Sequence, residues 1–149
     1  MYLKLGITLT RSHLNEWYGN ATNLANQTEL DLSNRNISLI QPNTFFDLRK
    51  VVKIDLYKNQ MSSLPSTIFA NSTNQLKFLR LASNQFVTLP FDLFKGLTQL
   101  ESLILDSNRL SLLPEAIFHG LESLKEIRLD NNELYQLPEN LFLNLNKVK

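Results

Sequence analysis

Apolar residues in this 149-residue chain recur as pairs two positions apart, and each pair follows the last by about 24 residues. Residues two apart in a β-strand point to the same side, so each pair predicts a short strand with one buried face. One such strand cannot bury that face alone, whereas strands stacked side by side can. The pattern therefore predicts five parallel strands with these inward pairs: Leu30 and Leu32, Ile54 and Leu56, Leu79 and Leu81, Leu103 and Leu105, Ile127 and Leu129.

An asparagine follows most of these pairs, inside phrases such as LRLASNQF and LILDSNRL. The positions are Asn59, Asn84, Asn108 and Asn132, at steps of 25, 24 and 24 residues. The first unit reads LDLSNRNI and places Arg35 at the corresponding position. An amide side chain offers both a donor and an acceptor, so an inward asparagine can satisfy backbone groups where the chain leaves the strand. We predict a ladder of asparagines that bonds loop backbone within and between coils.

A second phrase, such as LPFDLF or LPEAIF, follows each asparagine and ends on phenylalanine. Proline lacks the N–H that would continue a strand or helix, so Pro65, Pro90, Pro114 and Pro138 predict turns. We expect the repeated aromatic rings to stack as a spine on the side opposite the sheet. The members of this spine are Phe45, Phe69, Phe94, Phe118 and Phe142.

The combined phrase, Leu-x-x-Leu-x-Leu-x-x-Asn-x-Leu-x-x-Leu-Pro-x-x-x-Phe-x-x-Leu, resembles the typical 24-residue unit of leucine-rich repeat proteins. The chain is similar to the ectodomains of Toll-type receptors, Slit-like guidance proteins and variable lymphocyte receptors, without their cysteine caps. The resemblance implies an α/β fold: a right-handed, horseshoe-shaped solenoid with a five-stranded parallel sheet on its concave face. Turns and short helices are expected on the convex face.

The repeats divide the chain into an N-terminal segment, residues 1–27, and five coils over residues 28–149. The coils cover about residues 28–51, 52–76, 77–100, 101–124 and 125–149. Apolar residues at helical spacing over 12–25 predict a cap that is partly helical, with Ser12 as N-cap and Trp17 packed over Leu30 and Leu32. Nothing resembling a cap follows the last coil, so we expect the natural chain to continue beyond Lys149, or this end to self-associate.

Composition excludes several kinds of chemistry. The chain has 31 Leu and 17 Asn, no Cys and two His, and its formal net charge is +1. It therefore offers no thiolate site and no histidine cluster, and no Gly-rich phosphate loop is present. We expect neither metal nor cofactor, neither nucleic-acid binding nor catalysis. The chain contains no run of 18 apolar residues, so its sequence predicts no membrane-spanning helix.

The outward strand residues form the expected binding surface of such a solenoid. Most are polar, but three in the middle coils are apolar and surround Arg80: Tyr57, Phe78 and Ile104. Aromatic residues and arginine are enriched at interface hot spots. We predict a partner-binding site of Tyr57, Phe78, Arg80 and Ile104, with a rim of Asp55, Asp106 and Arg128. The alternative is that Tyr57 and Phe78 are present only because aromatic residues form strands well, and that the charged residues form lateral ion pairs on a solvated sheet.

The leading hypothesis is a protein-binding module, and the resemblance implies a cell-surface or extracellular setting. Four Asn-x-Ser/Thr acceptor sequences for N-glycosylation agree with export, although a chain this rich in asparagine contains some by chance. They begin at Asn20, Asn26, Asn36 and Asn71. The alternatives are a cytoplasmic scaffold, which the missing cysteines favour, and the recognition part of a larger enzyme such as a receptor kinase.

Overall fold

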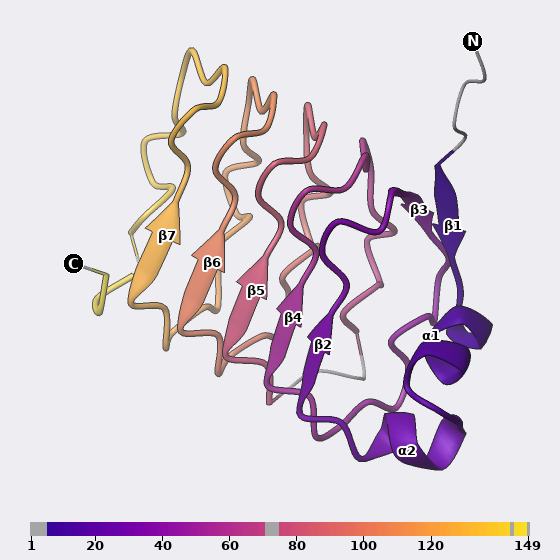
Figure 1. The fold of residues 1–149 in the computed structure, drawn as a ribbon. Coiled ribbons are helices and arrows are strands. Elements are labelled where there is room, and N and C mark those ends of the chain that lie inside the picture. The colour runs from indigo at the N-terminus through magenta and orange to yellow at the C-terminus, as the bar shows by residue number, and fades with distance from the viewer. Residues whose placement is uncertain (1–5, 71–74, 144, 149) are drawn as a thin grey trace, which may run out of the picture.

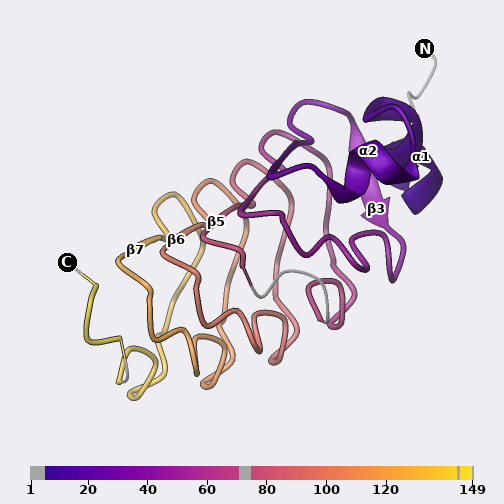
Figure 2. The ribbon, with the colours of Figure 1, turned by 90° about the horizontal axis from the view of Figure 1, so that it is seen from below.

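The computed structural model describes residues 6–70, 75–143 and 145–148. These residues form a solenoid whose coils stack side by side, with the helices at its N-terminal end (Figures 1 and 2). Each coil contributes one strand to a shared sheet, and the chain returns along the opposite side through turns. The predicted solenoid architecture is confirmed.

The main sheet contains five parallel strands in the order β2-β4-β5-β6-β7. The strands are β2 (Glu29–Asp31), β4 (Lys53–Asp55), β5 (Phe78–Arg80), β6 (Ser102–Ile104) and β7 (Glu126–Arg128). Their register aligns Leu30 with Ile54, Leu79, Leu103 and Ile127. This is the register that the apolar pairs predict, because a slip of one residue would turn every buried side chain outward.

The inward pairs form a continuous core along the solenoid. Both members are fully buried in the first four coils, from Leu30 and Leu32 to Leu103 and Leu105. Ile127 and Leu129 of the last coil pack against this core but are only partly buried. Burial thus depends on cover from both sides, which a neighbouring coil supplies inside the solenoid and the N-terminal segment supplies at the first coil.

The asparagine side chains lie at the exits of the strands and bond two coils each. Asn84 Nδ2 donates to the carbonyl oxygens of Leu56 (3.0 Å) and Leu81 (3.1 Å), and its Oδ1 accepts from Met61 N (3.1 Å). Asn108 repeats this arrangement one coil later, with Leu81, Leu105 and Phe86 as its partners. Each strand-end carbonyl in the middle of the solenoid therefore accepts from its own asparagine and from the next one.

Arg35 replaces the asparagine where this ladder begins. Its backbone N–H donates to Asn59 Oδ1 (3.1 Å), while its guanidinium carbon lies 4.2 Å from the centre of the Trp17 ring. The Tyr18 hydroxyl also reaches the first coil and donates to the Asp31 carbonyl (3.2 Å). The first coil is therefore closed by the N-terminal segment rather than by another coil.

The residue before each ladder position has a left-handed backbone, which the sequence analysis missed. The φ values are +54° at Asn34, +53° at Lys58, +54° at Ser83, +57° at Ser107 and +54° at Asn131. This conformation costs roughly 1–2 kcal/mol for residues other than glycine, and asparagine tolerates it best. The five positions hold asparagine twice, serine twice and lysine once, so no single residue type marks this geometry in the sequence.

The phenylalanines line the side opposite the sheet. The rings of Phe45 and Phe69 stack with centres 6.1 Å apart, and those of Phe118 and Phe142 do the same. Phe94 is also fully buried, whereas Phe142 in the last coil remains 43 % exposed. A ring in the last described coil has a neighbour on one side only, so it cannot be buried as deeply as the others.

The convex side consists of turns. After each proline the chain closes an i→i+3 turn, for example from Leu93 N to the Pro90 carbonyl and from Ile117 N to the Pro114 carbonyl, both at 3.1 Å. Across the described ranges, helix occurs only in the N-terminal segment. The short helices expected on the convex face are therefore not formed in the described coils, because starting a helix costs more than one or two turns regain.

The N-terminal segment contains two short helices, α1 (Arg11–Trp17) and α2 (Ala21–Ala25). The N-cap of α1 is Thr10, whose hydroxyl accepts from His13 N, so the prediction of Ser12 was wrong. Gly19 separates the helices with φ +98°, a conformation that side chains rarely adopt. Trp17 packs against the edge of the core, partly buried.

A small second sheet joins the N-terminal segment to the first coil and was not predicted. Strand β1 (Ile7–Leu9) pairs in parallel with β3 (Ile37–Ile40) of the first coil. The approach is close at Gly6, where an added Cβ would lie 2.4 Å from Ser38 Cβ. The Arg11 side chain also connects the N-terminal segment to the first coil, because its Nη1 donates to the Phe46 carbonyl (2.7 Å).

Replacing Asn108 with alanine should lower the free energy of unfolding by about 1–3 kcal/mol, because it leaves the buried N–H of Phe86 unpaired and removes one of the two bonds that the Leu81 and Leu105 carbonyls each accept. Chemical denaturation measures this difference. Asn140→Ala is the matched control, since Asn140 is exposed and lies outside the ladder. Equal stability of the Asn108 variant and the wild type would contradict the structural role of the ladder.

Candidate functional site

The candidate site lies on the outer face of the five-stranded sheet, which we call the concave face. Strands β4 and β5 turn Asp55, Phe78 and Arg80 outward because their neighbours in sequence, Ile54 and Leu79, are buried. Tyr57 lies two residues after the end of β4. Tyr57, Phe78 and Arg80 are all half-buried, so part of each side chain faces solvent.

Arg80 is positioned by an aromatic ring and a carboxylate. Its guanidinium carbon lies 3.8 Å from the centre of the Tyr57 ring, within the range of a cation–π contact. Its Nη1 lies 3.7 Å from Asp55 Oδ2, which is ion-pair distance but too long for a hydrogen bond. Asp55 is itself oriented, because its Oδ1 accepts from Tyr57 N at 2.9 Å. These three predicted site residues therefore form one cluster.

Phe78 is covered in part by Lys53 of the preceding strand. The Lys53 ammonium lies 5.7 Å from the centre of the Phe78 ring and 3.3 Å from Glu29 Oε2. Such a contact shields one side of the ring while leaving the ring half-buried. Phe78 thus lies on the same face as the Arg80 cluster and adds a second half-buried aromatic ring to it.

Ile104 does not belong to the exposed site, contrary to the prediction. It is only 6 % exposed. The register places it between Arg80 on β5 and Arg128 on β7, so a short side chain lies between two long ones. The outward direction was read correctly from the strand period, but the coverage by neighbouring strands was not visible in the sequence.

The remaining predicted residues form a second, charged group around Arg128. Its Nε lies 3.4 Å from Asp130 Oδ1 and 4.0 Å from Asp106 Oδ1. The hydrogen bond to Asp130 raises the pKa of the exposed Arg128 above its ordinary value. Side-chain exposure is 50 % for Arg128 and 14 % for Asp106. These are lateral ion pairs of the kind that contributes little to stability.

Asp31 begins the row of outward carboxylates on β2. Its Oδ1 accepts from the backbone N–H of Ser33 (3.0 Å) and from the Ser33 hydroxyl (2.7 Å). The hydroxyl bond is the main reason why the pKa of Asp31 lies below its ordinary value. The side chain bonds the chain two residues on, a local arrangement that aspartate favours at the end of a strand.

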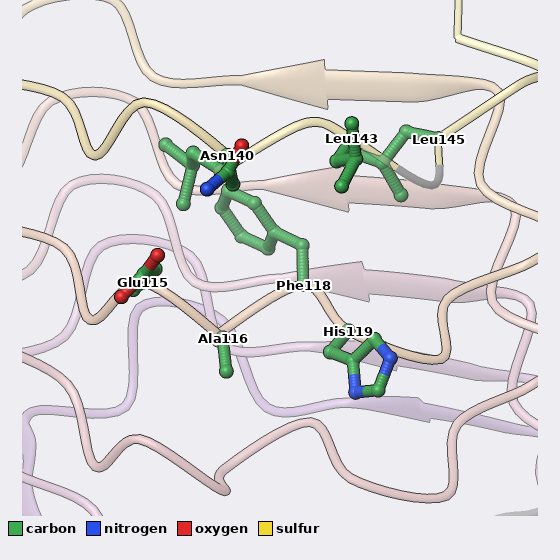
Figure 3. Close-up of a pocket in the computed structure, with 8 residues that line it drawn as sticks. Glu115, Ala116, Phe118, His119, Asn140, Leu143 and Leu145 are labelled. Atoms are coloured by element: carbon green, nitrogen blue, oxygen red, sulfur yellow. The ribbon is translucent and has the colours of Figure 1, made fainter.

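A separate pocket of about 290 Å³ lies on the convex side between the last two coils. Its lining is largely apolar, and in Figure 3 Leu143 and Leu145 lie together on one side while the Phe118 ring extends toward the chain at Asn140. His119 and Glu115 are the titratable residues of the lining. The sequence analysis assigned Phe118 to the buried spine and did not single out this pocket, because exposed lining residues such as Glu115 and His119 follow no repeat rule.

Comparison with protein families matches the leucine rich repeat model at residues 25–86, 54–110, 74–134 and 98–149. The chain belongs to the leucine-rich repeat family. A search of curated proteins finds no match. Among solved structures, this leucine-rich repeat chain resembles Toll from Drosophila in its complex with Spatzle, with 27 % identity and a TM-score of 0.75. It also resembles a leucine-rich repeat protein of Leptospira interrogans, with 30 % identity and a TM-score of 0.69.

Both likenesses cover 85 % of this chain but much less of the other proteins, 17 % of the Toll chain and 31 % of the Leptospira protein. This leucine-rich repeat chain therefore spans less than a third of the length of either. The structural likeness extends over most of this chain.

The acceptor sequences for glycosylation lie in different surroundings. Asn20 is the exposed N-cap of α2, and its Oδ1 accepts from Asn23 N (2.8 Å). Asn26 is exposed and accepts from Lys50 Nζ (2.7 Å), while half-buried Asn36 accepts from Gln60 Nε2 (2.5 Å). Asn71 lies outside the described residues. A sugar on Nδ2 would leave the Oδ1 acceptor of Asn20 in place.

Two further searches concern metal and membrane sites. Within residues 6–70, 75–143 and 145–148, no group of three His, Asp or Glu side chains is placed to hold a metal ion. Helices long and apolar enough to cross a membrane are likewise missing from the described part of this leucine-rich repeat chain.

Replacing Ser33 with alanine should raise the pKa of Asp31 toward its ordinary value, because the strongest bond to the ionised carboxylate is lost. A depressed pKa in the folded state stabilises the protein above the unfolded pKa, and this stabilisation disappears as pH falls through the folded value. The variant should therefore lose stability at neutral pH but not at strongly acidic pH.

An NMR titration of the Asp31 carboxyl carbon measures the shift, and denaturation at several pH values measures the stability. Ser63→Ala, at an exposed position, serves as the control. An unchanged titration of Asp31 in the Ser33 variant would refute the assigned cause.

Proposed function

We propose that this chain is a non-catalytic recognition module that binds a protein ligand on its concave face. The observation that carries the proposal is the cluster of Tyr57, Phe78 and Arg80, which leaves two aromatic rings and a guanidinium half-exposed on a sheet face. Aromatic residues and arginine supply most of the energy at protein interfaces when they lie close together near the centre. Asp55 orients the cluster, and Asp106 and Arg128 lie at its rim.

The setting that we propose is the cell surface or the extracellular space, as part of a receptor or adhesion protein. The structural likeness to Toll, whose complex with Spatzle is described as a molecular hub in development and innate immunity, supports this setting. The acceptor asparagines Asn20 and Asn26 are exposed and compatible with export. A cytoplasmic scaffold is the alternative that the absence of cysteine favours.

A photo-crosslinking experiment tests the proposal. The chain carries p-benzoylphenylalanine in place of Phe78 and is illuminated in extracts and in medium of the cells that express it. The control carries the same residue in place of Phe91, which is 69 % exposed in the turn after Pro90. We expect a specific protein adduct from position 78 that is missing at position 91.

Competition then defines the surface. An excess of unlabelled wild type should abolish the adduct, whereas the Phe78→Ala/Arg80→Ala double variant, with an unchanged circular dichroism spectrum, should not. An exported partner supports the extracellular setting, and a cytosolic partner supports the scaffold. Identical adducts from both positions, or competition by the double variant, would contradict recognition through the concave face.

A further inference from the structure

We propose that Arg80 is the specificity-determining residue of the concave face, and that it receives a carboxylate, an Asp or Glu side chain, from the protein partner. This inference rests on the proposed function and adds the chemistry of the ligand. It follows from two observations: Arg80 is held by contacts with Tyr57 and Asp55, and its guanidinium donors make no hydrogen bond with the described residues.

Arg80 is held in place without using its hydrogen-bond donors. Stacking on Tyr57 and attraction to Asp55 fix the plane of the guanidinium, so little side-chain entropy is lost on binding. Of the residues that the structure describes, none accepts a hydrogen bond from this side chain. By contrast, Arg11 donates to two backbone carbonyls and Arg128 donates to Asp130. The Arg80 side chain is 35 % exposed, so its free donors are accessible.

A second cation adds to the positive charge at this point. The ammonium of Lys58 lies 5.2 Å from the centre of the same Tyr57 ring. Asp55, the carboxylate at ion-pair distance from Arg80, has its Oδ1 already engaged by Tyr57 N. A carboxylate from a partner would accept the parallel N–H bonds that the Arg80 guanidinium offers.

Acidic residues on either side limit the partner to a local negative charge. Glu29 and Asp31 project from β2 on one side, and Asp106 and Asp130 follow β6 and β7 on the other. A long polyanion laid across the strands would meet these carboxylates, whereas a single acidic side chain reaches Arg80 without doing so. The geometry thus favours an acidic residue on a protein surface over a nucleic acid.

The apolar neighbours strengthen such a contact. Phe78 lies next to Arg80 in the outward row of β5, separated by one inward residue. When a partner covers Phe78 and Tyr57, water is excluded and the effective dielectric around the guanidinium falls. A buried charge-assisted pair of this kind discriminates strongly between an acid and its amide.

A random-peptide phage library is the probe for this proposal. Peptides are selected on the purified wild-type chain, and those that lose binding to the Tyr57→Ala/Phe78→Ala variant are retained as ligands of the concave face. We expect the retained peptides to share an Asp or Glu. Changing that acid to its amide should weaken binding to the wild type about 10-fold, and binding to Arg80→Gln less than about 2-fold.

Arg109→Gln is the matched control, because Arg109 is an exposed arginine on the loop after β6. It should bind the acid-bearing peptides as the wild type does, and thermal melts should show that all variants fold. Retained peptides that need no acid, or that bind Arg80→Gln unchanged, would overturn the carboxylate and leave the proposed function standing. If every selected peptide binds independently of Tyr57 and Phe78, both proposals fail.

Discussion

The hydrogen bonds of the buried asparagines are the constraint on which the rest of the structure depends. Wherever the chain leaves a strand it must turn while its backbone groups are still out of contact with water, and an unpaired group there is costly. Asn59, Asn84 and Asn108, each at most 8 % exposed, supply an acceptor and donors at that point. Because the same amide bonds its own coil and the previous one, it fixes the spacing between coils as well as the turn. The leucines can then form one continuous core instead of separate small ones.

The fold does not depend on the identity of the outward strand residues, so these residues can differ from coil to coil and form a recognition surface. On the concave face the residues do not repeat: an aromatic and arginine cluster on β4 and β5 lies beside a mainly ion-paired group on β6 and β7. The stacking of Arg80 on Tyr57 turns a flexible side chain into an oriented one, while the rigid sheet holds Phe78 beside it. The site thus combines a repeated framework with local side-chain packing that no repeat dictates.

The extent to which the sequence predicts the structure follows this division. The strands, their register and the asparagine bonds are set by residues that recur every 24 positions, so periodicity alone locates them. The N-terminal segment has no repeat, and local helical spacing did not reveal that Gly19 divides it or that β1 pairs with β3, a contact between distant residues. Within the site, the strand period gave the direction of Tyr57, Phe78 and Arg80. It could not give the burial of Ile104, which depends on the length of the two arginines beside it.

Native-state hydrogen exchange tests the role of the asparagines most directly. The amides of Met61 and Phe86 lie in loops but donate to the side-chain oxygens of Asn84 and Asn108. If the buried amides hold the coils together, these loop amides should exchange as slowly as the strand-end amides of Leu56 and Leu81, which bond the next strand. Exchange at the rate of exposed turn amides, while Leu56 and Leu81 stay protected, would contradict the account.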